Sequence, residues 1–115
     1  MDIDVKWGRK GGIAIAMLIG RFSGPNADLF QRLLENGVDP SDRALILDFE
    51  HVTFLSSAGL RVALSLARKF NGPGKKYAIC TLQEGVRGIV EVSGFDKIIS
   101  VYDSQTAAVE AFEKE

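Results

Sequence analysis

The sequence predicts a single α/β domain in which a mixed sheet starts as an antiparallel hairpin and carries about four helices. Two observations lead to this prediction. After residue 20, strand-like apolar runs alternate with amphipathic helical segments. Before that point, two strand-like runs follow one another with only a short segment around Gly11-Gly12 between them. The chain has 115 residues, the length of one domain, so residues 1–115 are predicted to fold as one unit.

The hairpin is predicted from two different strand patterns. Residues 2–7 alternate between polar and apolar, which places Ile3, Val5 and Trp7 on one face. The Gly11-Gly12 pair offers the turn. Residues 13–19 are apolar on both faces, which is typical of a strand covered on both sides, so this run lies inside the sheet.

The next elements are a helix and a central strand. Ser23-Gly24-Pro25-Asn26 supplies capping residues and a break, and Gly37 is the expected C-terminal cap. Apolar residues recur at helical spacing between them: Leu29, Phe30, Leu33 and Leu34. The apolar run 44–49 is a central strand that contains Asp48, and residues 50–55 form a loop.

The second half of the chain repeats the alternation. A helix starts at Ser57 and ends before residues 71–74. Its predicted apolar face consists of Leu60, Ala63, Leu64, Ala67 and Phe70. A strand at 77–80, a helix closed by Gly94 and a strand at 98–102 follow. Asp103 or Ser104 caps the last helix. Its apolar stripe consists of Ala107, Ala108, Ala111 and Phe112.

Charge and composition exclude several functional classes. Fourteen basic and fifteen acidic residues give a net charge of -1, so we expect neither nucleic-acid nor membrane binding. One cysteine, Cys80, and one histidine, His51, rule out an internal disulfide and a Cys/His metal cluster. The acidic N-terminus is unlike a signal peptide, and the apolar run 13–19 is too short to span a bilayer. We therefore expect a cytoplasmic protein without metal or cofactor.

The stretch 45–61 carries the most information about function. It runs from a strand through Asp48 and an apolar loop to a serine pair, and Gly59-Leu60 opens a helix. In this respect it resembles the STAS domain family of bacterial anti-sigma factor antagonists. Residues 92–112 are similar to the ending of that family, and Gly20-Arg21-Phe22 stands where its second strand closes. The resemblance covers nearly the whole chain.

The resemblance implies a function and a modified residue. In the family, the serine or threonine two residues before the glycine is phosphorylated by the partner, an anti-sigma factor with serine kinase activity. That position is Ser57. The unphosphorylated domain would bind this partner and free a sigma factor for transcription. We expect the partner contacts to lie around this helix start, at Ser23, Ser56, Ser57, Gly59, Leu60 and Arg61.

Departures from the family pattern leave alternatives open. Phosphorylated members usually carry Asp before the modified residue, where this chain has Ser56, and often Asp at the position of Ser23. Ser56 is therefore an alternative phosphorylation site. The chain is alternatively a non-phosphorylated scaffold component of a stress-signalling or lipid-transport complex. Locally, Ser57 also fits a helix N-cap worth about 1 kcal/mol. Gly59 fits either close approach of a partner or tight internal packing.

No catalytic residue is predicted. The serine pair lacks the first glycine of a G-x-S-x-G nucleophile elbow, and no acid is spaced to orient His51. Cys80 is interpreted as a small buried residue rather than a reactive thiol. The glycines at 85, 88 and 94 do not form a dinucleotide fingerprint. The sequence leaves the partner's identity and the oligomeric state open.

Overall fold

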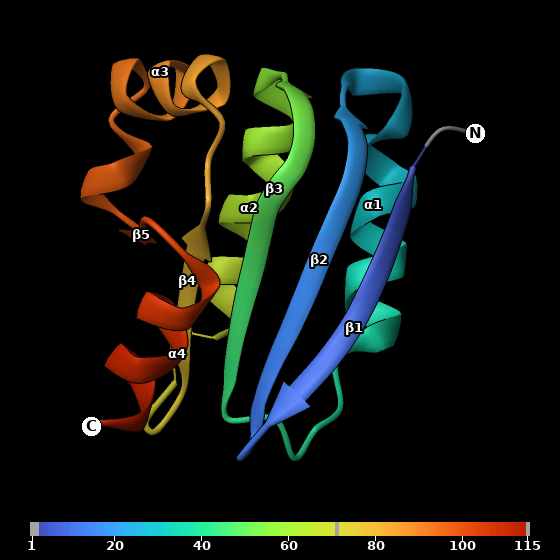
Figure 1. The fold of residues 1–115 in the computed structure, drawn as a ribbon. Helices are drawn as coiled ribbons and strands as arrows, with labels where there is room; N and C mark the ends of the chain where they lie inside the picture. Colours follow the sequence, from blue (N-terminus) through green and yellow to red (C-terminus); the bar gives the residue numbers. More distant parts are fainter. Residues whose placement is uncertain (1–2, 71, 115) are drawn as a thin grey trace.

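The computed structural model describes residues 3–70 and 72–114 as a five-stranded sheet with four α-helices (Figure 1). The elements in chain order are β1 (Asp4–Lys10), β2 (Ile13–Phe22), α1 (Gly24–Gly37), β3 (Ala44–Leu55), α2 (Ser57–Lys69), β4 (Lys76–Cys80), α3 (Glu84–Val92), the 3₁₀ helix η1 (Phe95–Lys97), β5 (Ser100–Tyr102) and α4 (Gln105–Glu113). Among these residues, no helix has the length and apolar character needed to cross a bilayer.

The sheet is mixed, as predicted. The strands lie in the order β1-β2-β3-β4-β5; β1 is antiparallel to β2, and the remaining neighbours are parallel. The hairpin turn uses Gly11 and Gly12, whose φ angles are 58° and 83°. These left-handed values are accessible to glycine without steric cost, which is why the Gly-Gly pair can close the hairpin.

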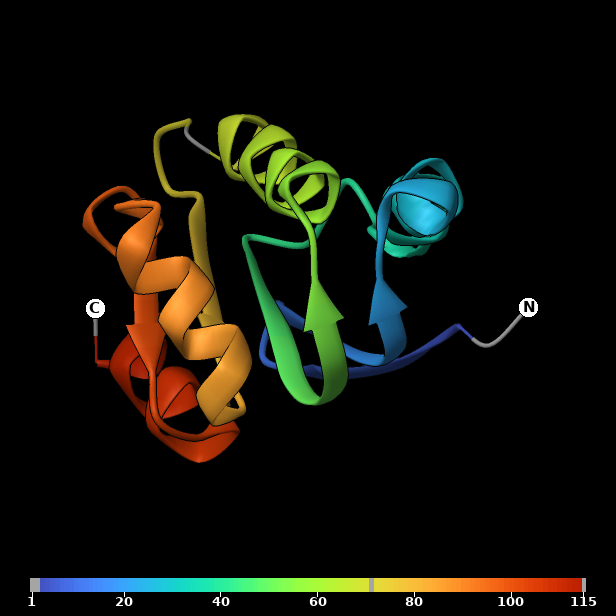
Figure 2. The same ribbon diagram turned by 90° about the horizontal axis from the view of Figure 1, so that it is seen from above.

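Helices cover both faces of the sheet. Figure 2 shows α1 and α2 side by side on one face and α4 on the other. Under α1, α2 and α3 lies the larger core cluster, in which the Phe22 and Phe30 ring centroids are 4.0 Å apart. Under α4 lies a smaller cluster that includes Ile46, Cys80 and Phe112. Residues of β2 and β3 contribute to both clusters, so these two strands form the centre of the fold.

The third strand is longer than predicted. Residues 50–55 belong to β3 rather than to a loop, so that prediction is wrong. The register shifts between the pairs Met17–Asp48 and Ile19–His51, and Glu50 and His51 are both exposed. This irregularity breaks the simple alternation of buried and exposed residues, which is why the segment looked like a loop.

Two helix faces also differ from the prediction. In α2 the fully buried residues are Gly59, Val62, Ala63 and Leu66, whereas the predicted Leu60, Leu64 and Ala67 are half-buried. In α4 they are Ala108, Val109 and Phe112, and Ala107 and Ala111 are half-buried. In both helices the buried stripe is rotated by about one residue, because packing against the sheet, and not the sequence pattern, fixes its phase.

Several predicted ends are corrected as well. Gly37 is the last residue of α1 and not its cap; a Cβ there would collide with the Trp7 ring. The last strand is Ser100–Tyr102, shorter than predicted because η1 precedes it. Ser104, not Asp103, caps α4, and its hydroxyl accepts the N–H of Ala107 at 3.0 Å. The first predicted strand included residue 2, which lies outside the described residues.

Candidate functional site

The site is assembled where β2 and β3 end side by side. These parallel strands finish at the pair Phe22–Leu55, so their carboxyl ends lie at the same edge of the sheet. Each strand leads directly into a helix, β2 into α1 through Ser23 and β3 into α2 through Ser56. The starts of two helices are thereby placed next to each other at this edge of the sheet.

Ser56 is the N-cap of α2. Its hydroxyl accepts the N–H of Gly59 at 3.2 Å and donates to the carbonyl oxygen of Phe22 at 3.1 Å. Its own N–H donates to the same carbonyl at 2.9 Å. The interpretation of Ser57 as the cap is therefore wrong by one residue. Ser56 ties the end of β2 to the start of α2, and its hydroxyl is fully engaged in that task.

Ser57 is the first residue of the helix and is exposed. Its hydroxyl makes no hydrogen bond to any of the residues that the structure describes. The first N–H groups of an α-helix lack intrahelical acceptors, and the helix dipole makes this end positive. No acidic residue lies in the first turn of α2. Ser57 thus presents a free hydroxyl in a setting that suits a negative group.

Gly59 is buried beneath the two serines. A Cβ at this position would lie 2.7 Å from the carbonyl oxygen of Phe22 and 2.9 Å from Cδ1 of Leu55. The close approach suggested by the sequence is therefore internal. It lets α2 begin directly over the end of β2, within reach of the Ser56 hydrogen bonds.

The other candidate contacts lie around these serines. Leu60 is half-buried against the larger core cluster, whereas Arg61 is exposed. Ser23 is half-buried and starts α1 without a side-chain capping hydrogen bond, although its carbonyl accepts the N–H of Asn26 at 3.1 Å. Contact of these residues with a partner remains a prediction.

A groove between α1 and α2 begins beside Ser57. It has a volume of about 610 Å³. Its lining residues from α1 are Gly24, Ala27, Asp28 and Gln31, and those from α2 are Ala58, Arg61, Val62, Leu64, Ser65 and Arg68. Polar and apolar residues line it in equal number, and the charged side chains are two arginines and one aspartate.

Sequence reasoning missed one pair on the opposite side of the strand ends. The guanidinium carbon of Arg21 lies 4.4 Å from the centroid of the half-buried Phe54 ring. The Asn26 side-chain amide donates to the Arg21 carbonyl at 3.0 Å. Two parallel strands that end at the same edge are expected to bring their last residues together. The partner of Arg21 could not be predicted, however, because the register of β2 and β3 shifts a second time between Gly20 and Arg21.

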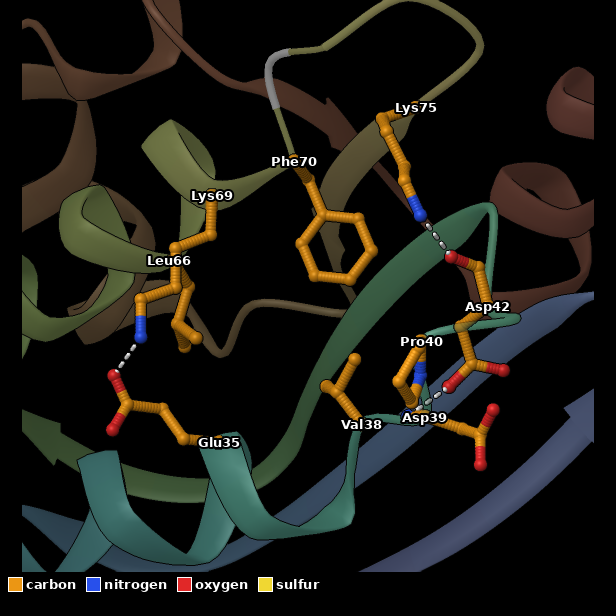
Figure 3. Close-up of a pocket in the computed structure, with 9 residues that line it drawn as sticks. All are labelled: Glu35, Val38, Asp39, Pro40, Asp42, Leu66, Lys69, Phe70 and Lys75. Atoms are coloured by element: carbon orange, nitrogen blue, oxygen red, sulfur yellow. Dashed lines mark hydrogen bonds and ion pairs between the residues drawn. The ribbon is translucent and has the colours of Figure 1, made fainter.

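A second cavity lies at the opposite ends of α1 and α2 (Figure 3). It has a volume of about 270 Å³. Its charged groups are engaged within the chain: Lys69 pairs with Glu35, Lys75 donates to the Asp42 carbonyl at 2.8 Å, and the Asp42 carboxylate accepts from Arg9 at 2.7 and 3.0 Å. These contacts join α1, α2 and β1, so this cavity is a structural junction.

Neither His51 nor Cys80 adds chemistry to the site. His51 is exposed on β3 opposite Ile19, several residues before the serine pair. Cys80 is buried, and burial raises the pKa of its thiol to about 11, which leaves it protonated at neutral pH. Over residues 3–70 and 72–114, no group of three or more metal-binding side chains is placed to hold an ion.

Comparison with known proteins identifies similar chains. A model of the STAS domain matches residues 6–108. The sequence is 37% identical over 101 residues to a Bordetella bronchiseptica protein named "Putative anti-sigma factor antagonist BtrV", covering 88% of this chain and 87% of that protein.

Solved structures share the fold. An anti-sigma factor antagonist from Mycobacterium paratuberculosis gives a TM-score of 0.85 at 21% identity, covering 96% of this chain and 94% of that one. The anti-sigma factor antagonist SpoIIAA, in its unphosphorylated form, gives a TM-score of 0.79 at 13% identity, covering 97% of this chain and 98% of that one.

Proposed function

The chain belongs to the STAS domain family, and from this premise we propose that it is an anti-sigma factor antagonist switched off by phosphorylation of Ser57. Unphosphorylated, it binds an anti-sigma factor with serine kinase activity and thereby frees a sigma factor. The observation that carries the proposal is that two adjacent serines have different roles. Ser56 holds the helix start, and Ser57 presents a free, exposed hydroxyl.

Because Ser56 and not Ser57 caps the helix, Ser57 can be phosphorylated without loss of the fold. A phosphate on Ser57 breaks no hydrogen bond made by that side chain, and the start of α2 tolerates negative charge. For a partner surface that fits a neutral hydroxyl, the phosphate adds about -1.5 to -2 charge and three acceptor oxygens. Repulsion and desolvation then weaken the complex. Phosphorylation of Ser57 thus has little effect on the stability of the fold but weakens the complex with the partner.

The chain contributes a substrate hydroxyl rather than an active site. The Ser57 oxygen attacks the γ-phosphorus of ATP held by the partner, the new O–P bond forms, and the bond to ADP breaks. The hydroxyl proton passes to a base of the partner. Such a partner and its ATP place the protein in the cytoplasm. The STAS family of anti-sigma factor antagonists is in general non-enzymatic, which agrees with this assignment.

Ser56 motivates the alternative of a non-phosphorylated scaffold in a stress-signalling or lipid-transport complex, because phosphorylated members of the family usually carry Asp there. Serine and aspartate are, however, both good N-caps, so either residue can hold the start of α2. The substitution therefore changes the charge beside Ser57 more than it changes the backbone. Ser56 itself is a poorer candidate for modification, because a phosphate there would displace its two side-chain hydrogen bonds.

The experiment that tests the proposal is capture of partners by tagged protein in lysate of the native host. We expect an anti-sigma factor kinase with the wild type and Ser57→Ala, and at least tenfold less of it, about 1.4 kcal/mol, with Ser57→Glu. Thr106→Glu is the matched control, because Thr106 is exposed in the first turn of α4, behind the serine cap Ser104. An identical partner set on all variants would instead indicate the constitutive scaffold.

A further inference from the structure

Ser57 and Arg61 lie one turn apart on the exposed side of α2. Residues four apart on a helix are neighbours, with about 6 Å between their Cβ atoms. Arg61 lines the groove between α1 and α2, and the groove begins at Ala58, next to Ser57. A group attached to the Ser57 hydroxyl is therefore within reach of the Arg61 side chain.

Arg61 is available for an anion. In the part of the chain that the structure describes, it forms no ion pair. Asp28 lines the same groove from α1 without pairing with it, and the first turn of α2 carries no acidic residue. The Arg61 guanidinium therefore does not have to break an existing ion pair before it binds a negative group at position 57.

We propose that Arg61 binds the phosphate of phosphorylated Ser57, so that modification neutralises one of the two arginines that line the α1–α2 groove. This inference rests on the proposed function, since it needs the phosphate. The geometry favours the pair, because an anion four residues before a cation is the better orientation on a helix. The planar guanidinium can donate two parallel hydrogen bonds to phosphate oxygens.

The pairing changes the groove as well as the serine. Before modification the groove presents Arg61 and Arg68 against a single carboxylate, Asp28, so it attracts an acidic segment of a partner. After modification Arg61 faces the phosphate, and the dianion outweighs its charge. A partner segment that fitted the positive groove then meets a negative one, which extends the effect of the phosphate beyond its own position.

The test is a phosphorus NMR titration of the full chain with phosphoserine placed at position 57 by genetic code expansion. We compare it with the same phosphoprotein carrying Arg61→Gln or Arg68→Gln. Arg68 lies in the same groove and is exposed, but it is about 10 Å further along the helix axis than Arg61. Circular dichroism verifies that each variant is folded.

We expect Arg61→Gln to raise the second pKa of the phosphate, ordinarily about 6, by about 0.3 unit, and Arg68→Gln to leave it unchanged. Arg61→Lys, which keeps the charge, should recover most of the shift. An unchanged pKa in Arg61→Gln, or equal shifts in both glutamine variants, would overturn the inference. The titration needs no partner, so its outcome is independent of the capture experiment. The Arg61 inference can fail while Ser57→Glu still reduces capture of the kinase, and it can hold even if capture is the same for all variants.

Discussion

The hydroxyl of Ser56 lies 3.1 Å from the carbonyl oxygen of Phe22 and donates a hydrogen bond to it. The contact joins the start of α2 to the end of β2 and fixes which of the two serines faces outward. Removing the Ser56 hydroxyl also removes the cap on Gly59. We expect Ser56→Ala to lower the free energy of unfolding by about 1 to 2 kcal/mol, measured by urea denaturation.

Ser57→Ala is the matched control for that measurement. Its hydroxyl makes no hydrogen bond to the described residues, and alanine favours helices, so the unfolding free energy should change by less than about 0.5 kcal/mol. Equal losses in the two variants would contradict the assignment of the cap to Ser56.

Gly59→Ala should destabilise the protein because the new methyl group meets the Phe22 carbonyl oxygen at 2.7 Å. We expect a loss of about 1 to 3 kcal/mol in urea denaturation, the usual cost of overpacking. Gly85→Ala tests the explanation, since a Cβ at Gly85 in α3 meets nothing within 4 Å. That variant should gain up to about 1 kcal/mol from helix propensity. A loss at both positions would point to a general intolerance of alanine instead.

Asp42 should make stability depend on pH in acid. Its carboxylate is buried and accepts two hydrogen bonds from Arg9, and this contact holds its pKa below the ordinary value of 3.8. A carboxyl with a lowered folded pKa stabilises the protein above its unfolded pKa, and the stabilisation is lost as the pH falls below about 4. Asp42→Asn should therefore cost about 2 kcal/mol at pH 7 and less at pH 3, in urea denaturation at both pH values. A difference between the two proteins that does not depend on pH would refute this role.

Cys80 should be unreactive in the folded protein. It is buried and its pKa is raised to about 11, so little thiolate exists at neutral pH. We expect iodoacetamide at pH 8 to label the thiol only when denaturant is added, with intact mass as the measurement. Rapid labelling of the native protein would mean that the β4 end opens far more readily than its packing indicates.

The order of elements followed from the sequence because each segment agrees with its final place. The alternation around Val5 and the Gly-Gly turn predicted the hairpin, and the buried run 44–49 predicted the centre of the sheet. The motif around Ser57 likewise predicted a helix that starts at the serine pair, which is where α2 begins. Local pattern and tertiary packing act in the same direction in these segments.

The features that could not be predicted from the sequence each depend on a shift of a single residue position. Two adjacent serines fit a cap equally well, and the contacts of the Ser56 hydroxyl with Gly59 and with the Phe22 carbonyl distinguish it from Ser57. The second half of β3 was missed because a shifted register exposes Glu50 and His51 together. The Arg21–Phe54 contact depends on a further shift. Such irregularities are set by contacts between distant segments and leave no periodic signal in the sequence.

The hydrogen bond from Ser56 to Phe22 joins residues that are 34 positions apart in the chain. It can form only when β2 and β3, which α1 connects, are paired in parallel. A contact at such sequence separation closes a long loop, and the chain entropy of closing that loop must be overcome before the contact can form. The arrangement that leaves Ser57 facing outward therefore requires two segments distant in the sequence to have come together. Under the proposed function, the partner kinase would therefore find its substrate only in chains that have completed the β2–β3 pairing, and unfolded chains would escape it.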